Sequence, residues 1–134
     1  MKKTALVMGV MLSALSTTAI AGGKRHITLH IINQTAYDFT NGNAEHKQVQ
    51  VDKVQTTVKG GQTGLVKFHF DEDSFSDVMM NVTYLVASDN GASVEVKYHV
   101  DTSGSDCKTI TPSDLQGAYN DCHDVDVRYS FAKK

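Results

Sequence analysis

The chain has 134 residues, of which 40% are hydrophobic and 21% charged, and its formal net charge is −2. This mild acidic balance argues against a nucleic-acid-binding domain, which would have a clustered basic face, and it gives no polybasic patch for anionic lipids. The length is that of one domain with its own hydrophobic core, which needs neither metals nor many cross-links in order to fold.

Residues 1–21 have the three parts of a secretory signal peptide. Two lysines precede an apolar run over 5–15, and Ala-Ile-Ala at 19–21 is an A-x-A cleavage site. The apolar run is shorter than the about 20 residues of a membrane-spanning helix, and the small residues at the cleavage site disfavour the alternative of a retained anchor. We therefore predict a cleaved signal peptide of bacterial type over 1–21, a single domain over 22–134 without a transmembrane segment, and a periplasmic or secreted location.

Alternation of hydrophobic and polar residues with a period of two dominates the rest of the chain. This period places successive side chains on opposite faces of a half-buried strand. The clearest examples cover 26–31, 66–70, 94–100 and 125–131. In the last of these, we expect Val125 to face the core together with the hydrophobic residues that follow it.

Three further strands are expected, over 34–40, 48–58 and 78–87. Turns that contain glycine or asparagine follow them, at 41–43, 59–61 and 89–91. The third strand is apolar on both sides, which predicts a central strand covered on both faces, and its turn predicts a hairpin with the next strand. Because no segment has the period of an amphipathic helix, we predict an all-β fold: a single antiparallel β-sandwich, or a flattened barrel, of seven or eight strands.

The two cysteines, Cys107 and Cys122, lie in a polar segment over 101–124 that interrupts the alternation. A cysteine pair in an exported chain indicates a disulfide; the alternative, a pair of metal-binding thiolates, lacks zinc-finger spacing. We predict a disulfide-closed loop with a helical turn that starts at Thr111 or Ser113. Long loops are often functional, and the candidate recognition residues are Asp101, Ser103, Asp106, Asp114, Tyr119 and His123.

Three histidines on the polar faces of predicted strands are candidate metal ligands. If their strands are neighbours, His30, His69 and His99 could converge on one ion; if not, they are solvated outward positions. His26 and His30 are about 13 Å apart along one strand, which is too far for them to share an ion.

An acidic segment follows the expected strand over 66–70. Oxygen ligands at this density can hold calcium, but the spacing fits no EF-hand, because the turn glycine and the closing glutamate are both missing. A solvated turn is the alternative, and the candidate ligands are Asp71, Asp73 and Asp77.

The chain contains no recognisable catalytic motif. Serine, histidine and aspartate are present without a G-x-S-x-G elbow. Asp121, His123 and Asp124 flank Cys122, but a disulfide-bonded cysteine cannot act as a nucleophile. We therefore expect a protein without catalytic activity and without a cofactor.

Three segments resemble small secreted β-sandwich proteins of the aegerolysin type. They are an opening strand that runs into an Asn-x-Thr turn (27–35), a glycine-rich turn before an aromatic strand (60–70), and a strand of G-x-V-x-Y character (91–98). The chain departs from that family in having no tryptophan. The resemblance implies binding to membrane lipids, alongside a pore-forming partner.

The first functional expectation is an exported, non-catalytic binding module that recognises a protein, a glycan or a lipid through its loops. Once the two lysines of the signal peptide are removed, 11 basic residues stand against 15 acidic ones, so nucleic acid is not expected as a partner. The alternatives are a membrane-lipid-binding toxin component, as the resemblance implies, an inhibitor of an envelope enzyme, and a small metal-dependent enzyme.

Overall fold

The computed structural model describes residues 23–88 and 90–134. The predicted signal peptide lies outside these residues, as does Asp89 of the predicted turn. The described residues form nine strands and no helix, so this part of the chain contains no helix that could cross a membrane. The strands are β2 (Lys24–Gln34), β3 (Phe39–Lys47), β4 (Gln50–Val54), β5 (Thr63–Asp71), β6 (Asp77–Val86), β7 (Ser93–Asp101), β8 (Gly104–Ile110), β9 (Leu115–Asn120) and β10 (Asp126–Lys133).

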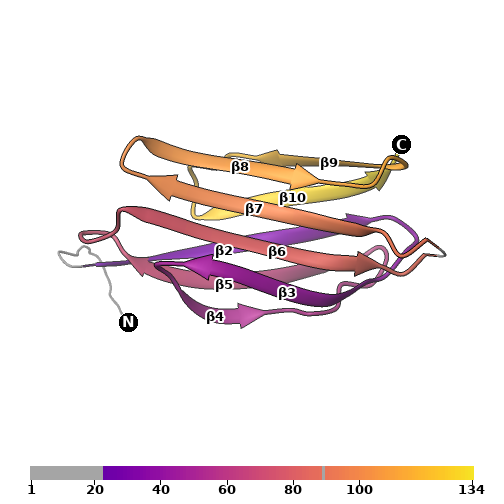
Figure 1. Ribbon diagram of the computed structural model, residues 1–134, viewed down its shortest axis with the longest axis horizontal. Helices are drawn as coiled ribbons and strands as arrows, with labels where there is room; N and C mark the ends of the chain where they lie inside the picture. The colour runs from indigo at the N-terminus through magenta and orange to yellow at the C-terminus, as the bar shows by residue number, and fades with distance from the viewer. Residues whose placement is uncertain (1–22, 89) are drawn as a thin grey trace, which may run out of the picture.

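The strands form two sheets that pack against each other as a sandwich (Figure 1). One sheet has five strands in the order β4-β5-β2-β10-β9, and the other has four in the order β3-β6-β7-β8. The predicted β-sandwich is therefore confirmed, although it has nine strands rather than seven or eight. It is not wholly antiparallel, because β10 pairs with β2 in parallel, with Asp126 beside Thr28 and Ala132 beside Gln34.

Inward-facing side chains of both sheets form one hydrophobic core. In β5 and β7 every second side chain is buried, as the period of two predicts. Phe68 of β5 meets Tyr98 of β7 with ring centroids 5.4 Å apart, and Phe39 of β3 meets Phe131 of β10 at 5.6 Å. Such aromatic pairs stabilise a core beyond the area that they bury. Val125 does not join the core, contrary to the prediction, because it lies in the turn before β10 and is 40% exposed.

Strand boundaries in the first half of the chain differ from the prediction. The strand expected over 34–40 is replaced by the last residue of β2, a bend, and the start of β3. The turn predicted at 41–43 lies inside β3, where a register shift against β6 accommodates it. Within 48–58, only the residues of β4 form a strand, and Val58 makes an isolated bridge to β3.

Two predictions for the second half are also corrected. The hairpin of β6 and β7 is present, but β6 is not covered on both faces, since its outward residues are partly exposed and Leu85 is 44% exposed. The polar segment 101–124 is not one long loop, because it contains β8 and β9 at the edges of the two sheets. Polar and charged side chains are common on edge strands. The helical turn expected after Thr111 is a non-helical turn that leads into β9.

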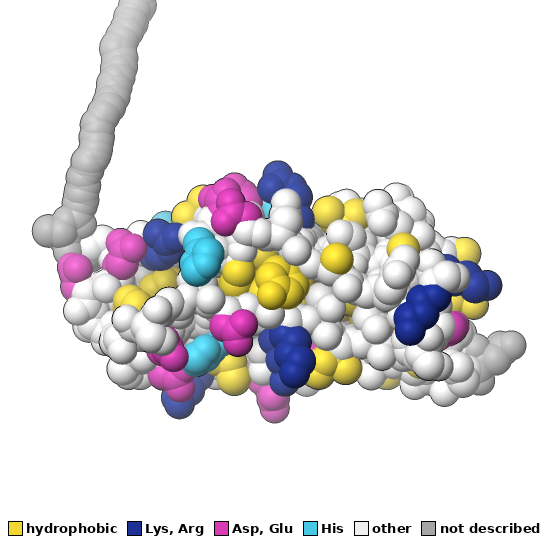
Figure 2. All heavy atoms as spheres, turned by 90° about the horizontal axis from the view of Figure 1, so that it is seen from above, with side chains coloured by type: hydrophobic (Ala, Val, Ile, Leu, Met, Phe, Trp, Pro, Cys, Tyr) yellow, Lys and Arg dark blue, Asp and Glu magenta, His cyan; other side chains and the backbone are white. Residues whose placement is uncertain are grey.

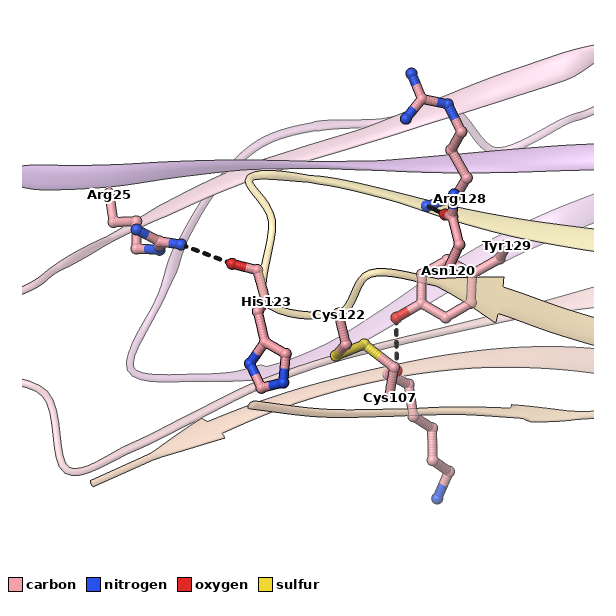
Figure 3. The surroundings of a disulfide bond; sticks show 8 residues. Arg25, Cys107, Asn120, Cys122, His123, Arg128 and Tyr129 are labelled. Atoms are coloured by element: carbon pink, nitrogen blue, oxygen red, sulfur yellow. Dashed lines mark hydrogen bonds between the residues drawn. A yellow bond between two sulfur atoms is a disulfide. The ribbon is translucent and has the colours of Figure 1, made fainter. Parts of the chain in front are cut away.

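The predicted disulfide between Cys107 and Cys122 is present, with Cα atoms 5.8 Å apart. Cys107 belongs to β8 of the four-stranded sheet, and Cys122 lies in the turn between β9 and β10 of the five-stranded sheet (Figure 3). Beside it, the hydroxyl of Tyr129 in β10 donates to the carbonyl of Lys97 in β7 at 2.6 Å. The bond and this contact therefore both join one sheet to the other.

Candidate functional site

Four turns that are far apart in the sequence meet at one end of the sandwich. They connect β3 to β4, β5 to β6, β7 to β8 and β9 to β10, and they lie at the left of Figure 1, where β2 begins. Hydrogen bonds link the first two: the side-chain oxygen of Gln48 accepts from the N–H groups of Ser76 and Asp77 at 2.9 and 3.0 Å. Arg25 of β2 donates to the carbonyl of His123 at 3.2 Å (Figure 3). We call this region the acidic end and define it as residues 47–50, 71–77, 101–104 and 121–125.

Negative charge is in excess at the acidic end. Its seven acidic residues, of 15 in the chain, are Asp71, Glu72, Asp73, Asp77, Asp101, Asp121 and Asp124. The basic residues are Lys47 and, at the start of β2, Lys24 and Arg25. A guanidinium nitrogen of Arg25 lies 3.4 Å from the carboxylate of Glu72, and Nζ of Lys47 lies 2.9 Å from that of Asp77. Figure 2 shows acidic and histidine side chains gathered toward the same left end of the molecule.

Hydrogen bonds stabilise the charged form of two carboxylates here. Lys47 and then His99 donate to Asp77 and hold the pKa of its carboxyl below the ordinary value. The hydroxyl and the N–H of Ser103 donate to Asp101 at 2.6 and 2.8 Å and lower the pKa of that carboxyl. Both carboxylates therefore stay negative at neutral pH.

The structure divides the candidate recognition residues between the two ends of the sandwich. Five of the six lie in or close to the turns of the acidic end: Asp101, Ser103, Asp106, Tyr119 and His123. Asp114 lies before β9 at the opposite end, where its carbonyl accepts from the N–H of Lys134 at 3.0 Å. The acidic turn over 71–77 lies at the same end as these five residues. Sequence reasoning missed this proximity, because only the pairing of the strands brings the turns together.

Two hydrophobic side chains are exposed beside these charges. Tyr119 of β9 is 45% exposed, and Val125 is 40% exposed. Cys122 lies between them in the chain, and its disulfide fixes the position of their turn against β8. The acidic end therefore offers apolar contact area as well as charge, and tyrosine is enriched where proteins contact one another.

The structure does not bring His30, His69 and His99 together, so of the two alternatives left open for them, convergence on one ion is wrong. His30 and His69 belong to the five-stranded sheet, whereas His99 belongs to the four-stranded sheet. Each ring contacts a carboxylate instead, in the pairs His30–Asp126, His69–Asp52 and His99–Asp77. The distance from ring nitrogen to carboxylate oxygen is 2.9 Å in the first two pairs.

A different group could hold a metal ion. Among residues 23–88 and 90–134, the His, Cys, Asp and Glu side chains close enough to share one ion are His26, Asp52 and His69. None of the acidic residues over 71–77 belongs to this group. Sequence reasoning missed His26 and Asp52 as partners of His69, because the register of three strands is needed to place them together.

The surface of the described residues is open. Four hollows on it have volumes between 200 and 330 Å³ and are open to solvent. Cys122 is held in the disulfide, so the neighbouring His123 has no thiol to activate. A ligand at these places would meet exposed turns and sheet faces.

No protein-family model matches the chain, and no curated protein has significant sequence similarity to it.

Proposed function

We propose that this protein is an exported, non-catalytic binding module that recognises the basic face of a partner protein through its acidic end. The observation that carries this proposal is the meeting of four turns, with seven acidic residues, at one end of a β-sandwich. Loops positioned by a rigid scaffold are the commonest place for a binding surface. The disulfide and the strand ends beneath the turns supply that scaffold.

The chemistry of the acidic end favours a basic protein over the other ligands. Carboxylates around an interface speed the encounter with a positive partner and set its orientation. Tyr119 and Val125 add apolar contact area of the kind that protein partners bury. A neutral glycan makes no use of the excess negative charge, and an anionic lipid surface repels it.

Export is part of the proposal. The disulfide between Cys107 and Cys122 supports an oxidising compartment. It agrees with the signal peptide predicted over 1–21. By joining the turn after β9 to β8, the bond also reduces the freedom that the turn would lose on binding, which favours affinity.

A pull-down from a bacterial envelope extract tests the proposal. Asp121→Asn combined with Asp124→Asn removes two negative charges from the acidic end and keeps an oxygen acceptor at each position. Glu95→Gln combined with Asp114→Asn removes the same charge elsewhere and is the matched control. We expect the wild type and the control to retain the same protein partner, and the acidic-end variant to retain about tenfold less of it. Raising the salt concentration to about 0.5 M releases the partner.

Equal recovery by the two variants, or no protein above background with the wild type, would overturn the proposal. Sedimentation with vesicles of phosphatidylcholine and sphingomyelin tests the lipid function that the aegerolysin resemblance implies. Vesicle binding that the acidic-end variant retains would favour that function over the one proposed.

A further inference from the structure

Two histidines face each other on the outer surface of the five-stranded sheet. His26 of β2 is directly opposite His69 of β5 in the antiparallel register, and the ring centroids are 5.0 Å apart. Directly opposite residues leave the same face of a sheet with Cβ atoms about 5 Å apart. The backbones of two paired strands therefore hold these imidazoles side by side, with no flexible loop between them.

Asp52 of the neighbouring strand β4 completes the cluster. The register of β4 against β5 shifts between Val51 and Lys53, so Asp52 is the additional residue at the shift. Such an irregularity re-aims a side chain, and here a carboxylate oxygen of Asp52 lies 2.9 Å from Nδ1 of His69. One ligand atom from each of His26, Asp52 and His69 lies within 4.8 Å of the other two.

We propose that His26, Asp52 and His69 bind a divalent transition-metal ion, with Zn²⁺ as the preferred one. Two imidazoles and a carboxylate are a common set of three protein ligands for zinc. Because Zn–N and Zn–O distances are about 2.0–2.2 Å, ligand atoms around one ion lie roughly 3–4 Å apart. Small side-chain rotations bring the three groups to that spacing. Calcium and magnesium prefer ligand sets made of oxygen alone.

The fourth coordination position faces solvent. His26 and Asp52 are exposed and His69 is half-buried. His69 also lines an open hollow of about 270 Å³ together with Lys24 and Gln50. The exposure of His26 and Asp52 leaves space for a water ligand, so the site differs from structural zinc sites, in which protein ligands fill all four positions.

The other histidine–carboxylate pairs provide matched controls within the same molecule. His30–Asp126 and His99–Asp77 each combine one imidazole with one carboxylate. Among the residues that the structure describes, neither belongs to a group of three ligands. If one imidazole and one carboxylate were enough to bind zinc, these two pairs would bind it as well as the cluster does.

Calorimetric titration of Zn²⁺ into untagged protein, purified without chelator, tests the proposal. We expect a single equivalent to bind the wild type. His26→Asn and Asp52→Asn each weaken that binding about tenfold or more, whereas His30→Asn leaves it unchanged. All of these positions lie on a sheet surface, and circular dichroism checks that each variant is folded. With Cu²⁺ as a paramagnetic probe, the NMR signals of the His26 and His69 rings broaden first, while those of His30 and His99 persist.

The absence of stoichiometric Zn²⁺ binding would overturn the proposal. So would an equal weakening by His30→Asn and His26→Asn, which would show unspecific binding to surface imidazoles. The proposal does not rest on the recognition of a basic partner. A protein that keeps its partner in the pull-down and binds no zinc would contradict the metal site alone.

Discussion

The two ends of the sandwich use their polar residues in opposite ways. At the end opposite the acidic end, Asn33 is 1% exposed, and its side chain makes hydrogen bonds to Thr35, Tyr37 and Val58. Gly60 lies so close to this turn that a Cβ atom would come within 2.8 Å of the carbonyl oxygen of Thr35. At the acidic end, the carboxylates lie at the surface and bond to neighbouring side chains and turns.

This difference separates polar residues that hold the fold from polar residues that are available to a partner. A buried amide whose donors and acceptors are all used is committed to the structure, and its removal leaves other buried groups without partners. An exposed carboxylate is only weakly coupled to the fold. Substitutions at the opposite end should therefore change the free energy of unfolding. Substitutions at the acidic end should change partner binding or the pKa of a carboxyl group.

The largest effect is expected at Asn33. Asn33→Ala removes the side chain that accepts from Thr35 and donates to the carbonyls of Tyr37 and Val58, so several buried groups lose their partners. We expect the free energy of unfolding to fall by about 4 kcal/mol, measured by urea denaturation. Gln34→Ala, at the exposed neighbouring position, changes it by less than about 0.5 kcal/mol. Equal midpoints for these two variants would contradict a structural role for the opposite end.

The second-largest effect is expected for the disulfide between Cys107 and Cys122. Replacing Cys107 and Cys122 together by Ala removes a constraint on a loop with a sequence separation of 15. We expect a loss of about 3 kcal/mol in the free energy of unfolding. Reduction of the wild type lowers its stability in the same direction, whereas the double variant does not respond to reductant. A variant as stable as the oxidised wild type would show that the hydrogen bond of Tyr129 and the core join the sheets without help from the disulfide.

A third prediction concerns the core between the two ends, where the buried hydroxyl of Tyr84 makes the free energy of unfolding depend on pH in the alkaline range. Burial raises the pKa of Tyr84 to about 12, and its hydroxyl donates to the carbonyl of Gln55 at 2.7 Å. In the unfolded chain a tyrosine ionises at about pH 10, so from there to about pH 12 only the unfolded state loses this proton. The free energy of unfolding therefore falls as the pH rises through that window, by up to about 2.7 kcal/mol. Below the window this group contributes no pH dependence.

Comparison with Tyr84→Phe isolates that contribution. The variant is less stable than the wild type at neutral pH, because the carbonyl of Gln55 loses its donor. The difference in free energy of unfolding between the two proteins shrinks as the pH rises through the window. A difference that stays constant there would mean that the phenol of Tyr84 ionises in the folded protein.

The smallest effect is expected at the acidic end. Lys47→Met removes the first hydrogen-bond donor to Asp77, so the pKa of that carboxyl rises toward its ordinary value. The stabilisation that the charged form provides is present above the ordinary pKa and is lost as the pH falls through the lowered one. The variant therefore loses it at a higher pH than the wild type. NMR titration of the carboxyl carbons measures this shift, and the pKa of Asp101, which depends on Ser103, stays in place.

The fold could be predicted wherever one face of a strand is buried and the other is not. Alternation located most of β2, β5, β7 and β10, because each has a continuous buried face. It failed in 101–124, where the inward positions of the edge strand β8 include the small polar residues Ser105 and Thr109. It also failed at Val125, whose place in the pattern continues the strand although the chain still turns there.

The candidate sites depend on information that a single sequence does not hold. The position of Asp114, at the opposite end from Asp101, follows from the direction of β8 and β9. His26 meets His69 only because of the register of β2 against β5. Asp52 lies near His26 and His69 because of a local shift in the pairing of β4 with β5, and no residue type in β4 indicates this shift in the sequence. Residue types were therefore predictable, and their convergence was not.

The parallel pair of β2 and β10 also affects the order in which the five-stranded sheet can be completed. β10 lies between β2 and β9 in the five-stranded sheet, so β9 has no neighbour in that sheet until β10 is in place. β2 can pair with β5 from an earlier part of the chain, but its parallel pairing of Thr28 with Asp126 needs the last of the described strands. Contacts of such long sequence separation slow folding. We therefore expect completion of the five-stranded sheet to follow formation of the hairpin of β6 and β7, which needs only strands that are adjacent in the sequence.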